Sequence, residues 1–248
     1  MNQAADLAGQ TALVTGATSG IGKATAFALA RRGARVLVSG RDEKRGAGIV
    51  AAIVAEGGRA DFLPADLGSA ESTRSLAQRA LALGNVDILV NNAGVFPFGT
   101  TAETAGSFDA VYATNVQAPF VLVGELAPKM AERGKGAIVN ITTMVAEFGM
   151  PGMALYGSSK AALNLLTKAW ATEFGPKGVR VNAVSPGPTR TEGTAPMGDG
   201  VDQLAAMAPA GRAAAPEEIA DAIVYLASDR ASFVHGAILP VDGGRTAA

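Results

Sequence analysis

The segment TALVTGATSGIGKATAFALARRGARVLVSG, residues 11–40, carries the pattern that decides the fold. An apolar run at 11–15 leads into a glycine-rich turn, and helical periodicity at 21–33 precedes a second apolar run at 35–40. The glycines of the turn are Gly16, Gly20 and Gly22. A strand, a glycine turn and a helix start in this order let backbone N–H groups and the helix dipole face a pyrophosphate. The segment therefore predicts a dinucleotide-binding βαβ unit.

The rest of the chain repeats this alternation of strand and helix. Further apolar strands are expected at 60–66, 86–93, 136–142, 179–186 and 237–243, and further helices at 43–57, 69–83, 107–133, 153–175 and 216–226. Continuous apolar strands that alternate with helices indicate a parallel sheet covered on both faces. We predict a single Rossmann-type, doubly wound α/β domain over residues 1–248, with about seven parallel strands.

One segment departs from the alternation. Residues 188–216 are rich in Pro, Gly and Thr, and a short helix is expected within them at 203–207. The segment follows the carboxyl end of a strand, where folds of this type bind ligands. A long excursion at that place is better explained as a lid over a site than as a disordered insert.

Composition excludes several classes of function. The net charge is −1, and 21 basic residues are interspersed among 22 acidic ones, so neither nucleic acid nor an anionic membrane is the expected partner. There is no cysteine and only one histidine, His235, so disulfides, thiolate catalysis and a metal site are not expected. Neither a signal segment nor an apolar run of ~20 residues is found, which predicts a cytoplasmic protein.

Six motifs make the chain resemble the short-chain dehydrogenases/reductases, in particular the branch of 3-oxoacyl-[acyl-carrier-protein] reductases. They are TGATSGIG at 15–22, NNAG at 91–94, Asn115 in TNVQAPF, YGSSK at 156–160, PGPTRT at 186–191 and VDGG at 241–244. Each alone is a weak signal, but together they follow the family's order and spacing over essentially the whole chain. The resemblance implies an oxidoreductase that transfers a hydride between a nicotinamide cofactor and a ketone or secondary alcohol.

The resemblance also places the cofactor along these motifs. The expected cofactor-binding residues are Gly16, Thr18, Ser19, Gly20, Ile21, Gly22, Arg41, Asp66, Leu67, Asn92, Ala93, Gly94, Tyr156, Lys160, Pro186, Gly187, Thr189 and Thr191. By resemblance, Asp66 would accept a hydrogen bond from the adenine amine, and Thr189 and Thr191 would anchor the carboxamide. A cap at the end of a strand is the simpler explanation for Asp66, and both can hold at once.

The choice between NADP and NAD is made at the end of the second strand. A carboxylate there binds the free 2′-hydroxyl, whereas an arginine can clamp a 2′-phosphate. This chain has Gly40 at the expected acidic position and Arg41 after it, which favours NADP(H). Asp42 is the alternative ribose ligand if the register is off by two, but it fits better as the N-cap of the next helix.

Tyr156 and Lys160 stand four residues apart and so share one face of a helix. A free tyrosine is a poor base at neutral pH, and bringing its pKa there requires about 4 kcal/mol of differential stabilisation. A neighbouring ammonium and an oxidised nicotinamide have the correct charge for this. In the reduction direction the same phenol donates a proton.

The resemblance completes the expected catalytic set with Asn115 and Thr143. It implies that Lys160 binds the nicotinamide ribose and that Asn115 holds a water that relays protons to Lys160. Thr143 stands where the family usually has serine, and it keeps the hydroxyl that would bind the substrate carbonyl. Thr142 is the alternative if the register slips by one.

Two functions follow from these residues. The first is an NADP-dependent reductase of 3-oxoacyl thioesters, cyclic or aryl ketones, or sugar-derived carbonyls. The second is a regulatory or sensor protein that binds NADP(H) without turnover, which only Thr143 supports. The 153–175 helix is apolar nearly all round, as Leu165 and Trp170 illustrate, so it must be buried on several sides. Together with the resemblance, this predicts a homotetramer.

Overall fold

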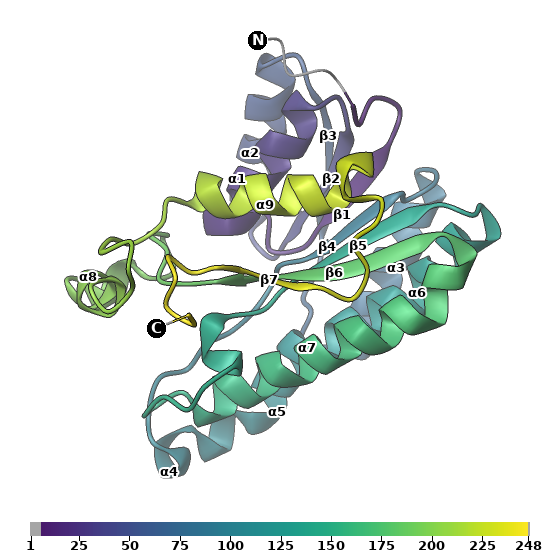
Figure 1. Cartoon of the computed structure of the whole chain (residues 1–248). Coiled ribbons are helices and arrows are strands. Elements are labelled where there is room, and N and C mark those ends of the chain that lie inside the picture. Colours follow the sequence, from purple (N-terminus) through teal and green to yellow (C-terminus); the bar gives the residue numbers. More distant parts are fainter. Residues whose placement is uncertain (1–5, 248) are drawn as a thin grey trace.

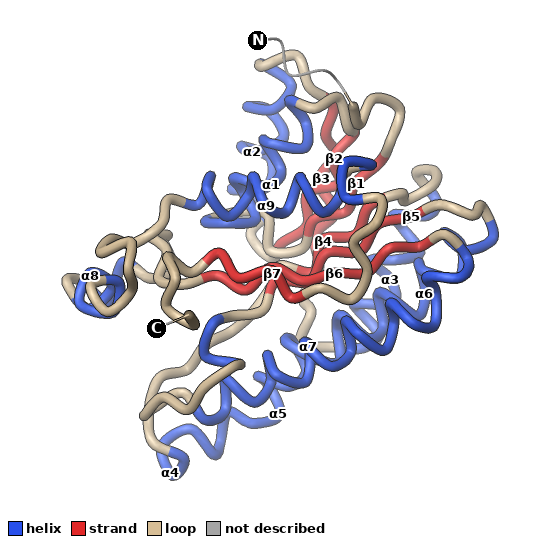
Figure 2. The backbone as a smooth tube through the Cα atoms, in the orientation of Figure 1, coloured by secondary structure: helices blue, strands red, loops and turns tan. Residues whose placement is uncertain are grey.

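A computed structural model describes residues 6–247 and shows a seven-stranded, all-parallel sheet between two layers of helices (Figures 1 and 2). The strands are β1 (Thr11–Val14), β2 (Arg35–Gly40), β3 (Arg59–Pro64), β4 (Ile88–Asn91), β5 (Gly136–Ile141), β6 (Val179–Pro186) and β7 (Ile238–Val241). Their order is β3-β2-β1-β4-β5-β6-β7, so the chain winds outward from β1 in one direction and then from β4 in the other. The predicted doubly wound fold is confirmed.

The helices divide between the two faces of the sheet (Figure 1). On one face lie α1 (Gly20–Arg31), α2 (Glu43–Ala55) and α9 (Pro216–Ala227), and on the other lie α3 (Ala70–Ala82), α5 (Phe108–Tyr112), α6 (Ala118–Glu132) and α7 (Ala154–Phe174). Adjacent strand residues point to opposite faces, so Leu13 packs under α3 and α6 while Val14 packs under α1 and α9. This double burial explains the continuous apolar strands. Within residues 6–247 no helix combines the length and apolarity needed to cross a membrane.

The helix expected at 107–133 is interrupted, which corrects the sequence prediction. A π-helical turn, η2 (Ala113–Gln117), separates α5 from α6 and carries the fully buried Asn115. Single π turns inside helices are frequent at functional sites, and periodicity does not reveal them. The structure also adds α4 (Thr101–Thr104), which begins with reciprocal capping bonds between Thr100 and Glu103. Short 3₁₀ turns are η1 (Ala105–Ser107), η3 (Met144–Ala146), η4 (Gly175–Lys177), η5 (Ala195–Met197) and η6 (Asp229–Ala231).

The segment at 188–216 is ordered and contains η5 and α8 (Gly200–Ala205). The expected helix at 203–207 is therefore present but begins and ends earlier. A bridge between Thr189 and Ala214 closes the base of the segment, and the amide of Ala210 donates to the carbonyl of Gly243 at 2.9 Å. These bonds hold the segment beside the carboxyl ends of β6 and β7 (Figure 1).

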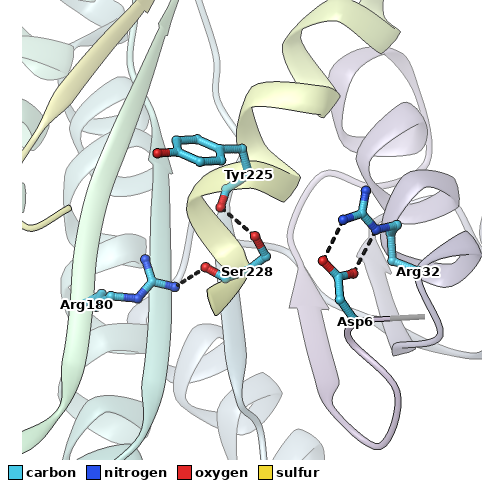
Figure 3. Close-up of polar contacts among 5 residues, drawn as sticks. All are labelled: Asp6, Arg32, Arg180, Tyr225 and Ser228. Atoms are coloured by element: carbon cyan, nitrogen blue, oxygen red, sulfur yellow. Dashed lines mark hydrogen bonds and ion pairs between the residues drawn. The ribbon is translucent and has the colours of Figure 1, made fainter. Parts of the chain in front are cut away.

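Arg180, near the start of β6, fastens the sheet to the end of α9 (Figure 3). Its guanidinium donates to carbonyls that include those of Leu226, at 2.7 Å, and Ser228, at 3.0 Å. Burial lowers the pKa of the Arg180 guanidinium. The last carbonyls of a helix lack partners within it and favour a cation, so these bonds stabilise the charged form of Arg180. An ion pair between Arg32 and Asp6 fixes the end of α1 nearby. These contacts lie away from the segment at 188–216 (Figure 1).

Candidate active site

Two adjoining cavities lie at the carboxyl edge of the sheet. The one beside Tyr156 has a volume of about 230 Å³, and the one beside the glycine turn about 330 Å³. They meet at Ile21, Asn92, Gly94, Phe96 and Thr191, which line both. Every residue predicted for the site lines one cavity or the other, with the exception of Asn115, which lies behind the wall.

The glycine turn between β1 and α1 brings backbone amides to the wall of the larger cavity. Gly16 and Gly20 adopt φ angles of +62° and +51°, a region that favours glycine. A side chain at Gly22 would place its Cβ 2.3 Å from the carbonyl oxygen of Gly16, so only glycine permits this packing. Ser19 occupies the N-cap position of α1 without a side-chain cap bond. The Ser19 side chain therefore leaves the N–H groups at the start of α1 to other acceptors.

Glu192, in the segment at 188–216, already contacts the start of α1. Its Oε2 accepts a hydrogen bond from the backbone N–H of Gly20 at 2.8 Å. A hydrogen bond from its own backbone amide, followed by the one from Gly20, lowers the pKa of the Glu192 carboxyl. Sequence analysis missed this contact because its two residues are 172 positions apart. The carboxylate takes a position that a pyrophosphate oxygen would also seek.

The end of β2 forms the outer wall of the same cavity. A Cβ at Gly40 would lie 2.7 Å from Cγ2 of Thr18, so a carboxylate side chain at this position does not fit without a shift. Asp42 caps α2, as preferred from the sequence, because its Oδ1 accepts from the amide of Arg45 at 2.9 Å. Its Oδ2 binds Nε of Arg45 at 2.8 Å. Arg41 is exposed at the rim of the cavity.

Asp66 and Asn92 line the larger cavity and also hold its loops. One oxygen of Asp66 accepts from the amide of Gly68 at 3.0 Å, so the strand-end cap is present, and the second oxygen stays outside that bond. The Asn92 amide donates to the carbonyl of Thr15 at 2.8 Å, and the Thr15 hydroxyl accepts from the backbone of Asn92 and Ala93. These bonds fix the loop after β4 against the glycine turn.

Tyr156 and Thr143 both line the smaller cavity. Thr143 follows β5 at the N-cap of η3, and Tyr156 lies in the first turn of α7. Burial raises the pKa of Tyr156 to about 12, and a hydrogen bond with the Thr143 side chain acts in the opposite direction. Lys160 makes no contribution to this pKa shift, contrary to the sequence-based expectation. The phenol is therefore protonated at neutral pH.

Lys160 lies one turn beyond Tyr156 on α7 and is 3% exposed. Its Nζ donates to the carbonyl of Ile141 at 2.7 Å, and burial lowers its pKa to about 8. A Cβ at Gly94 would lie 3.3 Å from both this Nζ and Oδ1 of Asn115, so the two side chains approach the same glycine. Asn115 itself is bonded to both backbone groups of Val95, each at 2.9 Å. It therefore positions the loop that carries Gly94, and the relay to Lys160 stays a prediction.

The segment after β6 forms one side of the smaller cavity. Thr189 is buried and donates to the carbonyl of Gly187 at 2.9 Å, while Thr191 pairs with Thr194 at 3.2 Å between the hydroxyl oxygens. Phe96 packs its ring edge-on against Tyr156, with centroids 6.1 Å apart. Phe96 was missed because only its position after NNAG, and no chemistry of its own, distinguishes it in the sequence.

These features fit an elongated dinucleotide. The larger cavity contains the backbone amides at the start of α1, the close backbone packing at Gly22 and, at its rim, Arg41. It adjoins the smaller cavity at Gly94, which lines both. A phenol beside a threonine hydroxyl stands at the far end and can exchange a proton with a small molecule.

Comparisons with known proteins agree on the family. Residues 16–246 match the family model described as enoyl-(acyl carrier protein) reductase. A solved structure of a short chain dehydrogenase/reductase family protein is 51% identical, with a TM-score of 0.91, and the match covers 98% of this chain and 100% of that one. A putative NAD(P) dependent gluconate 5-dehydrogenase from Beutenbergia cavernae, with bound NADP, is 41% identical, with a TM-score of 0.92 and 98% coverage of both chains. Cyclopentanol dehydrogenase of Comamonas testosteroni is 38% identical over 95% of this chain and 96% of its own.

Proposed function

The chain belongs to the short-chain dehydrogenase/reductase family, and from this premise we propose that it is an oxidoreductase that uses NADP(H) to interconvert a ketone and a secondary alcohol. The observation that carries the proposal is the pair of hydroxyls of Tyr156 and Thr143 facing one cavity. When bound, the nicotinamide supplies or accepts the hydride at the carbonyl carbon.

The chain's own residues carry the proton chemistry. In reduction, Tyr156 donates its proton to the oxygen that becomes the alcohol, and Thr143 donates a hydrogen bond to the same oxygen. A phenol with a pKa of about 12 is held in the form that donates. Lys160 is held by its bond to the carbonyl of Ile141, and Asn115 positions the loop that carries Gly94 beside it. A chain that only sensed the cofactor would not require this pair of hydroxyls, so we favour turnover.

Use of NADP is supported by the end of β2. Gly40 leaves no carboxylate to repel a 2′-phosphate, and the carboxylate of Asp42 is engaged at the start of α2. The exposed Arg41 is free to reach a phosphate at the rim. The similar gluconate 5-dehydrogenase with bound NADP adds support.

We also propose a cytoplasmic homotetramer. The α6 and α7 helices lie side by side on one face, joined by contact between the rings of Phe120 and Trp170 with centroids 6.1 Å apart (Figure 1). Phe120 is 56% exposed and Leu165 on α7 is 70% exposed. Large apolar side chains exposed together support an interface with a second copy.

Oxidation of NADPH in the presence of a panel of ketones, followed at the nicotinamide absorbance, tests the function. We expect turnover by the wild type and loss of turnover in Tyr156→Phe, which retains the aromatic ring but lacks the hydroxyl that donates the proton. Tyr225→Phe is the matched control, since Tyr225 lies on α9 across the sheet. Equal turnover in Tyr156→Phe and wild type would contradict the assignment, and absence of turnover with every ketone despite NADPH binding would favour a sensor.

A further inference from the structure

The smaller cavity is lined mainly by apolar side chains. Its wall includes Phe96, Met144, Met150, Met153, Met197 and Leu204, so four of the seven methionines of the chain gather here. The cavity also contains Pro186 and Gly187, the expected neighbours of the nicotinamide. Of its roughly 230 Å³, only a part therefore remains for a substrate. That space suits a body of the size of one ring.

Most hydroxyl groups on this wall are already bound within the protein. Thr142 donates to the carbonyl of Val184 at 3.2 Å, Thr189 to that of Gly187 at 2.9 Å, and Thr194 to that of Thr189 at 2.8 Å, while Thr191 pairs with Thr194. The hydroxyls of Thr143 and Tyr156 remain, since neither donates to a backbone carbonyl, and both line the cavity. The wall therefore offers two hydroxyl donors at one place, which is enough for a single oxygen atom.

The part of the cavity wall formed by residues 6–247 has no unbound cation to pair with an acidic substrate. Among the described residues that line the cavity, Lys160 is the only one with a charged side chain, and its ammonium binds the carbonyl of Ile141 at 2.7 Å. A carboxylate or phosphate placed among the methionines would lose its hydration without gaining a partner. An additional hydroxyl would likewise lose its hydrogen bonds to water.

On the basis of the proposed function, we propose that the substrate is a compact, neutral ketone, or its alcohol, with one oxygen on an otherwise apolar ring. The threonine hydroxyls already donate within the protein, which disfavours polyhydroxylated carbonyls such as sugar acids. Among the described lining residues Lys160 is the only cation, which disfavours keto acids. The oxygen lies between Thr143 and Tyr156, and the ring lies against Phe96 and the methionines.

Two ketones of similar shape test this inference. With NADPH, kcat/KM for 4-methylcyclohexanone should exceed that for 4-oxocyclohexanecarboxylate by about a hundredfold or more, because the carboxylate has no partner. The value for 4-hydroxycyclohexanone should be lower than for the methyl compound by about tenfold. A carboxylate or hydroxyl compound reduced as well as the methyl compound, within about threefold, would overturn the proposed class.

The substrate class and the proposed function can fail separately. If no ketone is reduced, the function fails, and binding of 4-methylcyclohexanol and of 4-hydroxycyclohexanecarboxylate to the NADP⁺-loaded protein, measured by calorimetry, still decides the class. Tighter binding of the methyl compound supports the class. Equal binding of both, tighter binding of the carboxylate or no detectable binding of either overturns it.

A pair of lid variants tests where the wall lies. Met197 lines the cavity and is 37% exposed, whereas Met207 is 51% exposed and lies outside the lining. Met197→Lys should raise kcat/KM, or affinity, for the carboxylate compound by about tenfold and lower it for the methyl compound. Met207→Lys adds the same charge to the lid and should change neither. An unchanged preference in both variants would remove Met197 from the substrate wall and overturn the arrangement.

Discussion

Replacement of Thr143 by valine tests the catalytic position at which a threonine stands in place of the usual serine. Valine keeps the branched shape and volume of threonine but has no hydroxyl. Because the Thr143 side chain is only 9% exposed, an isosteric change avoids a cavity in the wall. Thr143→Ser is the companion variant, since it keeps the hydroxyl and loses only a methyl group.

The expected magnitude follows from the count of donors. The other threonine hydroxyls of the cavity donate within the protein, so the substrate oxygen has Tyr156 and Thr143 as its two donors. Removing one such donor lowers kcat by ~10²–10³, or about 2.7–4 kcal/mol of transition-state stabilisation. The hydrogen bond from Thr143 also lowers the pKa of Tyr156, so its loss moves the onset of alcohol oxidation to higher pH.

The assay measures kcat, the melting midpoint and NADPH affinity for each variant. Thr142→Val is a matched control, because Thr142 is adjacent and buried, and its hydroxyl donates to the carbonyl of Val184 at 3.2 Å. That variant should lose ~0.5–1.5 kcal/mol of unfolding free energy and retain kcat. Thr143→Ser should retain both.

A folded, cofactor-binding Thr143→Val with kcat within about threefold of wild type would refute the reasoning. If Thr142→Val lost the activity instead, the role would pass to Thr142 and the register would be off by one.

Four further outcomes are expected. Arg41→Ala should weaken NADPH binding relative to NADH by ~1.5–3 kcal/mol, about tenfold to more than a hundredfold, and a wild type that prefers NADH would contradict the clamp. Glu192→Ala should tighten NADP(H) about two- to fivefold by calorimetry, because the carboxylate no longer competes for the amide of Gly20; weaker binding would mean that Glu192 holds the closed lid. Light scattering should show a tetramer that Leu165→Glu dissociates, whereas a monomeric wild type at micromolar concentration would rule out the proposed interface. Oxidation of the alcohol requires the Tyr156 phenolate, whose fraction grows with pH at every pH below the pKa of about 12. The rate of oxidation should therefore rise between about pH 6 and 9, and a flat pH profile would count against Tyr156 as the base.

The sheet was predictable because the strands are apolar in the sequence and are buried on both faces in the fold. Each strand lies between two helical layers, so side chains on both faces are apolar, as with Leu13 and Val14, and the run is continuous in the sequence. The helix at 107–133 was predicted as one element for the same reason. Its π turn depends on where Asn115 finds partners, in Val95 and Ser159, and these are distant contacts that periodicity does not encode.

The same distinction separates the predicted site residues from the missed ones. The local sequence pattern predicts Gly22 and Asp42, because the turn before α1 requires a glycine and the start of α2 favours an N-cap residue. Glu192 and Phe96 lie on loops that reach the site from other parts of the sheet. Their contacts join residues far apart in the sequence, so no short sequence pattern predicts them. Such loops carry the differences in specificity between proteins that share this scaffold.

The electrostatics of Tyr156 required the structure for a different reason. Sequence shows that a lysine lies one turn away, and this suggests a lowered phenol pKa. Burial acts on both groups, however, raising the pKa of Tyr156 to about 12 and lowering that of Lys160 to about 8, because each loses hydration in its charged form. Both shifts favour a neutral phenol beside a weakly held ammonium. The side chains by themselves thus suit proton donation, and the oxidation direction requires a positive charge brought into the cavity from outside the chain.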